Sequence, residues 1–147
     1  MSLVASEIRD GVAVLTLDRP RANAFNPQLV ADISSALTAN AGAGAVVISS
    51  ALPGMFSAGW DLPLLIDRDR KGMEEFVGAY SDLVRQLFVF GPPVVAALPG
   101  HAIAGGLIFA MAAGLSPCGA TTSRSGRMIW PNGAAAVAPL GSGARRP

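Results

Sequence analysis

Two short apolar runs constrain the fold of this chain more than any other feature. They are Ala45–Ser50 and Val94–Leu98, and neither contains a charged residue. Short runs of small and β-branched residues are typical of strands that are buried on both faces of a sheet. Each run is followed first by a loop containing glycine and then by residues with helical spacing. Repeated strand, loop and helix segments predict an α/β fold.

The beginning of the chain predicts a hairpin and a helix. Residues 3–9 and 12–18 are strand-like runs separated by Asp10 and Gly11, a dipeptide typical of a two-residue hairpin. After the polar loop 19–26, Pro27 can occupy the first helical turn with Asn26 as its N-cap. Apolar residues then recur at helical spacing to about Ala39.

Further helices are predicted from the middle of the chain onward. We expect a loop over 51–57, a short helical stretch that begins near Asp61, a longer helix over 72–90 and an apolar helix over 104–113. One face of the longer helix is marked by Phe76, Tyr80, Leu83, Leu87 and Phe90. Residues 116–147 are rich in Ser, Gly, Ala, Pro and Arg without any period. We therefore expect a core of residues 1–115 and an irregular basic tail over 116–147.

The composition is that of one ordinary domain. The chain has 147 residues, of which 14% are charged, and a net charge of +1. Its lone Cys118 excludes an intrachain disulfide and fits a cytoplasmic setting. The apolar run 94–115 is long enough to span a bilayer, but Pro99 and several glycines interrupt it. We expect a buried strand, turn and helix there, and neither a membrane span nor a nucleic-acid partner.

Two glycine-containing loops carry the chemistry. FSAGWDL covers residues 56–62, and GHAIAGG covers residues 100–106. Each follows a predicted buried strand and brings glycine to the start of a helix, which leaves backbone N–H groups unpaired. An anion or a developing oxyanion is the natural occupant of such groups. Neither loop is a GxGxxG or a Walker motif.

These segments resemble a known family. FSAGWDL, followed along the chain by PPVVAALPGHAIAGG, is similar to the two signature segments of the crotonase superfamily, the enoyl-CoA hydratases and isomerases. The hairpin and the loop RPRANAFN resemble the opening of that family. The resemblance implies an α/β, crotonase-like spiral of ββα units. We expect it to be incomplete at the C-terminus, because the helices that usually build the family's trimers or hexamers have no counterpart here.

The resemblance also implies a site. It makes the backbone N–H groups of Trp60 and Gly105 an oxyanion hole for the thioester carbonyl of an acyl-CoA. Coenzyme A would then belong to the substrate, and we expect no separate cofactor and no metal. The family pattern also implies further residues next to the ligand: Arg21, Ala22, Ala24, Ala58 and Asp61. Of these, Arg21 would be the partner of a phosphate group.

The chain departs from the family pattern at the catalytic glutamates. The first falls on Ile108 and the second on Asn132 or Gly133, and all ten acidic residues lie at or before Asp82. A side chain without a titratable group cannot exchange protons. The resemblance therefore implies an isomerase-like protein rather than a two-glutamate hydratase. The alternative is a non-catalytic acyl-CoA-binding or assembly fragment. In either case we expect the tail after Gly114 to reflect truncation, degeneration or an out-of-frame reading of a longer gene.

Simpler roles are open for the same residues. Gly59, Gly105 and Gly106 could serve only to let strand and helix pack closely. Asp61 is most simply an N-cap, and the Trp60 side chain is a packing residue. Ser57 and His101 fit structural roles in turns and loops. A hydrolase that uses these two residues is a third reading, although the chain lacks the Gly-x-Ser-x-Gly elbow.

Overall fold

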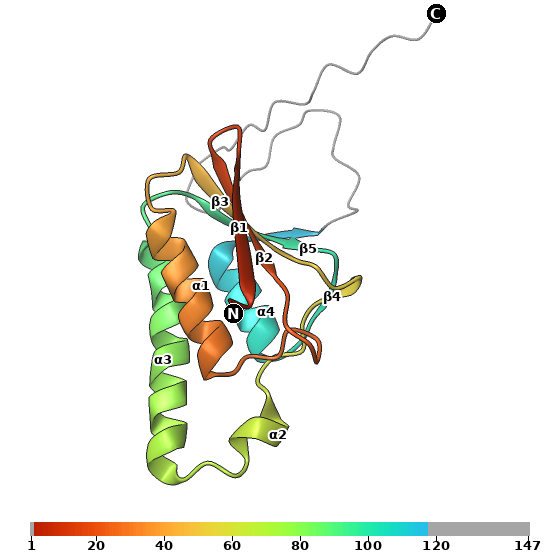
Figure 1. Ribbon diagram of the computed structural model, residues 1–147, viewed down its shortest axis with the longest axis vertical. Coiled ribbons are helices and arrows are strands. Elements are labelled where there is room, and N and C mark those ends of the chain that lie inside the picture. The colour runs from red at the N-terminus through yellow and green to blue at the C-terminus, as the bar shows by residue number, and fades with distance from the viewer. Residues whose placement is uncertain (1, 118–147) are drawn as a thin grey trace, which may run out of the picture.

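The computed structural model of the chain describes residues 2–117 (Figure 1). Its elements follow one another as three ββα units and a final strand, and the second unit has two helices. In chain order they are β1 (Val4–Arg9), β2 (Val12–Leu17), α1 (Pro27–Ala39), β3 (Ala45–Ser50), β4 (Gly54–Ser57), α2 (Leu62–Leu65), α3 (Arg70–Val89), β5 (Val94–Leu98), β6 (Gly100–Ala102), α4 (Gly105–Ala113) and β7 (Leu115–Pro117).

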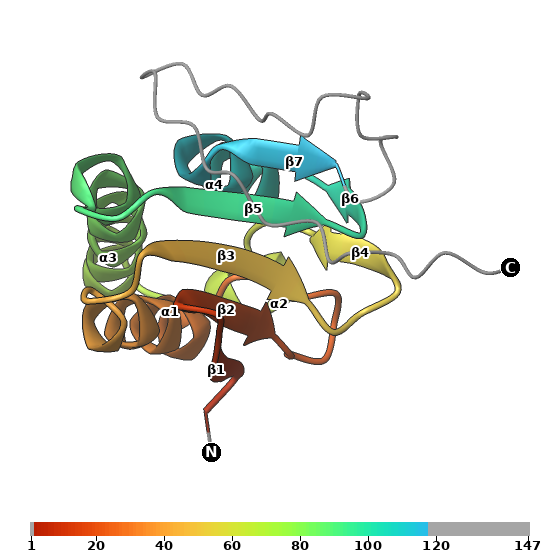
Figure 2. The ribbon, with the colours of Figure 1, turned by 90° about the horizontal axis from the view of Figure 1, so that it is seen from above.

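The strands form two sheets. Five of them make one sheet in the order β1-β2-β3-β5-β7, in which β1 and β2 are antiparallel and the other pairs are parallel (Figure 2). Strands β4 and β6 make a separate parallel pair. The second and third units thus each give their first strand to the large sheet and their second strand to the small one. This arrangement confirms the predicted spiral of ββα units.

Local sequence signals account for the hairpin and for the start of α1. Asp10 and Gly11 have φ angles of 49° and 81°, as a type I′ turn requires at both of its central residues. Asn26 is the N-cap of α1, where its side chain accepts a hydrogen bond of 2.8 Å from the N–H of Leu29. Pro27 opens the helix, where the lack of an N–H costs nothing. These predictions are confirmed.

The core lies between the large sheet and the helices. Helix α3 packs against both α1 and α4, while α1 contacts β1 and α4 contacts β5; Figure 1 shows α1 and α3 side by side. The residues of α3 that are buried in this layer are Phe76, Tyr80, Leu83 and Leu87, as predicted, whereas Phe90 lies beyond the helix and is half-buried.

Burial of the central strands differs from the prediction at one strand. In β3 only Val46 and Ile48 are buried, while Val47 on the opposite face is half-buried. The expectation that Ala45–Ser50 is buried on both faces is therefore wrong, because the described helices cover one face of this strand. Strand β5 does bury three consecutive residues, Val94 to Ala96.

The small sheet was not predicted. Strand β4 lies within the expected loop 51–57, and β6 lies within the expected glycine-rich turn. Their pairing is long-range, with Gly54 opposite Gly100. The two backbones approach so closely that a Cβ on Gly100 would meet the Gly54 carbonyl carbon at 2.0 Å. Such short strands carry little periodic signal, so only the pairing reveals them.

The end of the described region adds one more short strand. Strand β7 takes in Ser116 and Pro117, so the expected irregular tail lies outside the described residues except for these two. None of the helices within residues 2–117 is long and apolar enough to cross a membrane.

Candidate functional site

Three loops meet beyond the carboxyl ends of the parallel strands. They are the loop 18–26 after β2, the loop 58–61 after β4 and the turn 103–106 that leads from β6 into α4. Backbone hydrogen bonds join them in pairs. Ala58 N–H donates to the Ala22 carbonyl at 2.9 Å, and Ile103 N–H donates to the Ser57 carbonyl at 2.9 Å. The two loops that the sequence singled out therefore lie in contact.

A buried asparagine fixes the first loop. Arg21, Ala22 and Asn23 have φ angles of 66°, 60° and 49°, a left-handed conformation that costs energy for residues other than glycine. Asn23 is fully buried, and its Oδ1 accepts from Arg19 N–H at 2.8 Å. Its Nδ2 donates to the Phe56 carbonyl at 3.0 Å. Sequence reasoning missed this residue, although asparagine's tolerance of left-handed backbone is a usable signal.

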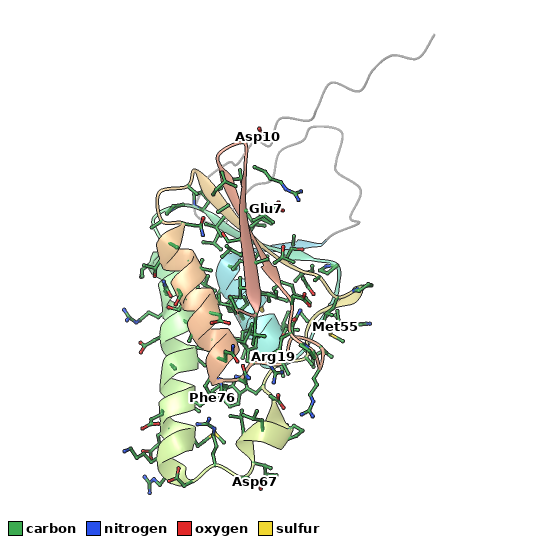
Figure 3. The ribbon with its side chains drawn as sticks, in the orientation of Figure 1. Glu7, Asp10, Arg19, Met55, Asp67 and Phe76 are labelled. Atoms are coloured by element: carbon green, nitrogen blue, oxygen red, sulfur yellow. The ribbon has the colours of Figure 1, made fainter. Side chains whose placement is uncertain are left out.

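A buried ion pair links the first loop to the second. Arg19 Nη2 lies 2.5 Å from Asp61 Oδ2, and the two side chains are only 10% and 2% exposed. Figure 3 shows Arg19 at the end of the hairpin opposite to Asp10. Asp61 does stand at the N-cap position of α2, but its side chain makes no cap hydrogen bond. The N-cap role expected for this carboxylate is therefore wrong, because the guanidinium of Arg19 engages it.

The second loop leaves one N–H group free. The neighbours of Trp60 are all engaged: Gly59 N–H donates to Ser57 Oγ at 3.2 Å, and Asp61 N–H donates to the Phe25 carbonyl at 2.9 Å. Within residues 2–117, no acceptor engages the backbone N–H of Trp60. This is one of the two groups that the family resemblance implied.

The third segment turns sharply before α4. Gly106 N–H donates to the Ile103 carbonyl at 2.8 Å, and Ala104 between them has φ 46° and ψ −118°. These angles belong to the first central position of a type II′ turn, which normally requires glycine. The next residue, Gly105, is the first of α4, where N–H groups have no partner within the helix. No acceptor among the described residues engages its N–H.

The two free N–H groups belong to residues in close contact. Gly59 has a φ of 89°, and a Cβ placed on it would meet the Ile103 carbonyl oxygen at 2.8 Å and Gly105 N at 3.1 Å. A Cβ on Gly106 would likewise meet the Ser57 carbonyl oxygen at 2.6 Å. The close-packing role of these glycines is therefore real, and it is what brings Gly105 N next to the Trp60 loop.

Aromatic side chains of α3 pack against the two residues that carry the free N–H groups, Trp60 and Gly105. Trp60 makes edge contacts with Phe76 and Tyr80, with ring centroids 5.4 and 5.6 Å apart, which agrees with the packing role expected for its side chain. Its Nε1 is buried and has no hydrogen-bond partner among the described residues. The Tyr80 hydroxyl donates to the Gly105 carbonyl at 2.5 Å. Sequence reasoning placed Tyr80 on a buried helix face and missed this contact.

The surface beside the free N–H groups is apolar. Helix α4 and the turn before it expose several large apolar side chains, by 40% to 61%: Ile103, Leu107, Ile108 and Met111. Ile108, at the first glutamate position of the family pattern, is 55% exposed and has no group that can transfer a proton. Asn132 and Gly133, the candidates for the second position, lie outside the described residues.

The structure does not support the hydrolase reading. Ser57 is buried, and its hydroxyl donates to the Asn23 carbonyl at 2.8 Å. His101 is exposed on β6, where it stands opposite Met55. The serine thus has a structural role that fastens the first two loops together.

The remaining predicted ligand neighbours lie within the first two loops. Arg21 is exposed, Ala22 and Ala58 are half-buried, and Ala24 is buried. A separate hollow of 660 Å³ lies between α1 and α3, where Val30, Glu75 and Gln86 help to line it. No residue of the three loops lines that hollow, so it is not part of this site.

Known proteins share these segments. The family model for enoyl-CoA hydratase/isomerase matches residues 7–125. The probable enoyl-CoA hydratase 2, mitochondrial, of Arabidopsis thaliana is 34% identical over 118 residues, which cover 74% of this chain and 38% of that protein. Carnitinyl-CoA dehydratase of Proteus mirabilis is 29% identical over 113 residues, which cover 75% of this chain and 43% of that protein.

Solved structures agree with this relationship. Enoyl-CoA hydratase from Thermoplasma volcanium superposes with a TM-score of 0.71 at 27% identity, over 76% of this chain and 46% of that one. Human mitochondrial delta3-delta2-enoyl-CoA isomerase superposes with a TM-score of 0.72 at 26% identity, over 76% and 45%. The chain spans less than half the length of these relatives. It belongs to the enoyl-CoA hydratase/isomerase family, and its fold is that of the crotonase superfamily.

Proposed function

We propose that this chain binds the thioester of an acyl-CoA and polarises the thioester carbonyl between the backbone N–H groups of Trp60 and Gly105. The observation that carries the proposal is that these two N–H groups, in loops joined by hydrogen bonds, have no acceptor among the described residues. A carbonyl oxygen that enters between them would supply the missing acceptor. Both donors are fixed by the loops before any ligand arrives.

The chemistry that such a site supplies is the stabilisation of negative charge. When a base takes a proton from the carbon next to the thioester, the electron pair of the broken C–H bond moves onto the carbonyl oxygen and forms an enolate. Delivery of a proton to the γ-carbon of a 3-enoyl chain then completes an isomerisation. Preorganised donors stabilise that oxygen more strongly than they stabilise the neutral carbonyl. Loss of one such donor costs about 3 kcal/mol of transition-state stabilisation. Trp60 and Gly105 act here through their backbone only.

The surroundings of the N–H pair favour an acyl-CoA. The exposed apolar residues Leu107, Ile108 and Met111 on α4 offer contact to a hydrocarbon chain. On the joined loops, exposed Arg21 is available to a phosphate group of coenzyme A. Ala22, Ala24, Ala58 and Asp61 belong to the same loops, and we propose them as neighbours of the coenzyme A part of the ligand.

Isomerase-like chemistry fits this chain better than hydration by two glutamates. Hydration by two glutamates needs two positioned proton-transfer groups, whereas isomerisation needs only one base that takes a proton from one carbon and returns it to another. Ile108 cannot serve as the first glutamate of a hydratase. Asp61, the carboxylate nearest in sequence to Trp60, is engaged by Arg19. The same two observations favour a second candidate function, in which the chain binds acyl-CoA without turning it over.

Turnover assays separate these two functions. We expect purified protein to convert 3-enoyl-CoA to 2-enoyl-CoA and to hydrate 2-enoyl-CoA far more slowly. Binding without conversion of either compound would favour the non-catalytic function. Calorimetry tests the shared step, since we expect a CoA thioester to bind much more tightly than the free fatty acid of equal length. Equal affinities would contradict both functions.

The contribution of Arg21 can be measured in the same calorimetric assay. We expect Arg21→Ala to weaken binding of the CoA thioester about tenfold, because one charge-assisted hydrogen bond to phosphate is lost. Arg85→Ala, on the exposed face of α3, is the matched control and leaves the affinity unchanged. An identical affinity for both variants would remove Arg21 from the proposed phosphate contact.

A further inference from the structure

The geometry points to Tyr80 as a positioning residue that holds Gly105, and therefore its N–H, in place for the thioester carbonyl. This inference rests on the proposed function and adds a residue from helix α3, outside the three loops. Tyr80 would touch no substrate atom. It acts through the backbone of Gly105.

Tyr80 contacts all three segments that build the site. Its ring makes edge contacts with Phe25 of the first loop and Trp60 of the second, with centroids 5.3 and 5.6 Å apart. Its hydroxyl donates to the carbonyl of Gly105, the first residue of α4, at 2.5 Å. Tyr80 as a whole residue is only 4% exposed, so water does not compete for this hydrogen bond.

Gly105 is confined from two directions. A Cβ on Gly105 would meet the Trp60 indole at 2.8 Å and the Tyr80 hydroxyl oxygen at 3.4 Å. The residue before it, Ala104, holds a positive φ of 46° that is unfavourable for alanine. A strained turn can relax into another conformation unless its neighbours hold it. The hydrogen bond from Tyr80 supplies that restraint, because it holds the carbonyl of Gly105, the same residue whose N–H is the proposed donor.

The hydroxyl of Tyr80 keeps its proton throughout the ordinary pH range. Burial raises the pKa of Tyr80 to about 12, while a backbone hydrogen bond from Phe109 opposes the shift. A group with that pKa is a constant hydrogen-bond donor and a poor proton donor or acceptor near neutral pH. This agrees with a positioning role and not with general acid or base chemistry.

The first test is Tyr80→Phe, which keeps the ring and removes the hydroxyl. The readout is the carbonyl stretching frequency of a bound, unreactive acyl-CoA thioester, together with kcat and KM. We expect a smaller frequency shift and a kcat lowered about five- to tenfold, the effect of losing one hydrogen bond, with little change in KM. Ser34→Ala removes a hydroxyl hydrogen bond between α1 and α3 and is the matched control, with an unchanged shift.

The outcomes of this test separate the inference from the proposed function. A natural protein that binds the thioester without any carbonyl shift contradicts the proposed function. If the carbonyl frequency shift seen with the unsubstituted protein is fully kept in Tyr80→Phe, the proposed role of Tyr80 is overturned. Backbone amide relaxation of Gly105 without ligand adds a readout that is independent of substrate. We expect its order parameter to fall in Tyr80→Phe and not in Ser34→Ala, and equal order parameters would overturn the inference.

A second experiment needs no substitution, in case Tyr80→Phe does not fold. The chain contains one tyrosine, so biosynthetic incorporation of 3-fluorotyrosine labels Tyr80 alone. We expect its fluorine resonance to move when a CoA thioester binds and to stay in place when coenzyme A with a free thiol binds. The reason is that only the thioester oxygen engages Gly105. An identical spectrum with both ligands would overturn the coupling between Tyr80 and the carbonyl site.

Discussion

The guanidinium of Arg19 and the carboxylate of Asp61 form a buried ion pair, 2.5 Å from Nη2 to Oδ2, between two loops that are far apart in sequence. Arg19 Nη1 also donates to the Ala24 carbonyl at 2.9 Å. Asp61 directly follows Trp60, whose N–H is one half of the proposed oxyanion hole. The ion pair therefore anchors that N–H relative to the first loop.

We predict that Asp61→Asn destabilises the protein by about 3–5 kcal/mol, because it leaves the Arg19 charge buried without a counter-charge. Urea unfolding measures this change. Glu74→Gln is the control, since the Arg70–Glu74 pair has side chains that are 91% and 64% exposed and exposed pairs contribute less than about 1 kcal/mol. Equal losses in the two variants would contradict the structural role of Asp61.

We predict that Gly105→Ala lowers kcat about a hundredfold or more, as expected when an oxyanion donor is displaced. The added Cβ would meet Trp60 Nε1 at 2.9 Å, so stability should also fall, by about 1–3 kcal/mol. Gly78→Ala is the matched control, since nothing lies within 4 Å of its Cβ position on α3. There we expect a gain of about 0.5–1 kcal/mol. An unchanged kcat in Gly105→Ala would argue against the Gly105 N–H as an oxyanion-hole donor.

We predict that the raised pKa of Tyr80 makes the protein less stable at high pH. Folded Tyr80 keeps its proton to about pH 12, whereas the unfolded chain loses it near 10.0. Between these values the folded state binds more protons, so the free energy of unfolding falls as pH rises, by about 1.4 kcal/mol per unit at most. Denaturation from pH 9 to 12 measures the slope, and Tyr80→Phe should reduce it. Near-ultraviolet absorbance of the single tyrosine reports the ionisation directly.

We predict that hydratase activity is very low and that Ile108→Glu alone does not restore it. Each positioned acid or base contributes about a hundred- to ten-thousandfold, and one glutamate leaves the other proton transfer unassisted. Ile108 is 55% exposed, so the variant should fold. Steady-state hydration of 2-enoyl-CoA is the measurement. A kcat near ~10 per second for the natural chain would show that another group serves as the acid or base.

Much of the fold follows from the sequence because its signals are local. Asp10 and Gly11 suit the hairpin turn, and Asn26 with Pro27 suits the start of α1; each acts on backbone within a few residues. The apolar spacing of α3 likewise predicts which of its side chains are buried. The two glycine-containing loops and their family resemblance also point to Trp60 and Gly105 as candidate site residues.

Tertiary structure decided how those loops are held. The β4–β6 pairing, the Arg19–Asp61 ion pair and the hydrogen bond from Tyr80 to Gly105 join residues that are 25 or more positions apart. Local propensity does not encode such contacts, because each depends on two segments that meet only after the chain folds. Local sequence patterns are therefore enough to indicate the family and the candidate N–H groups, whereas the ion pair of Asp61 and the contact of Tyr80 with the site arise only from packing.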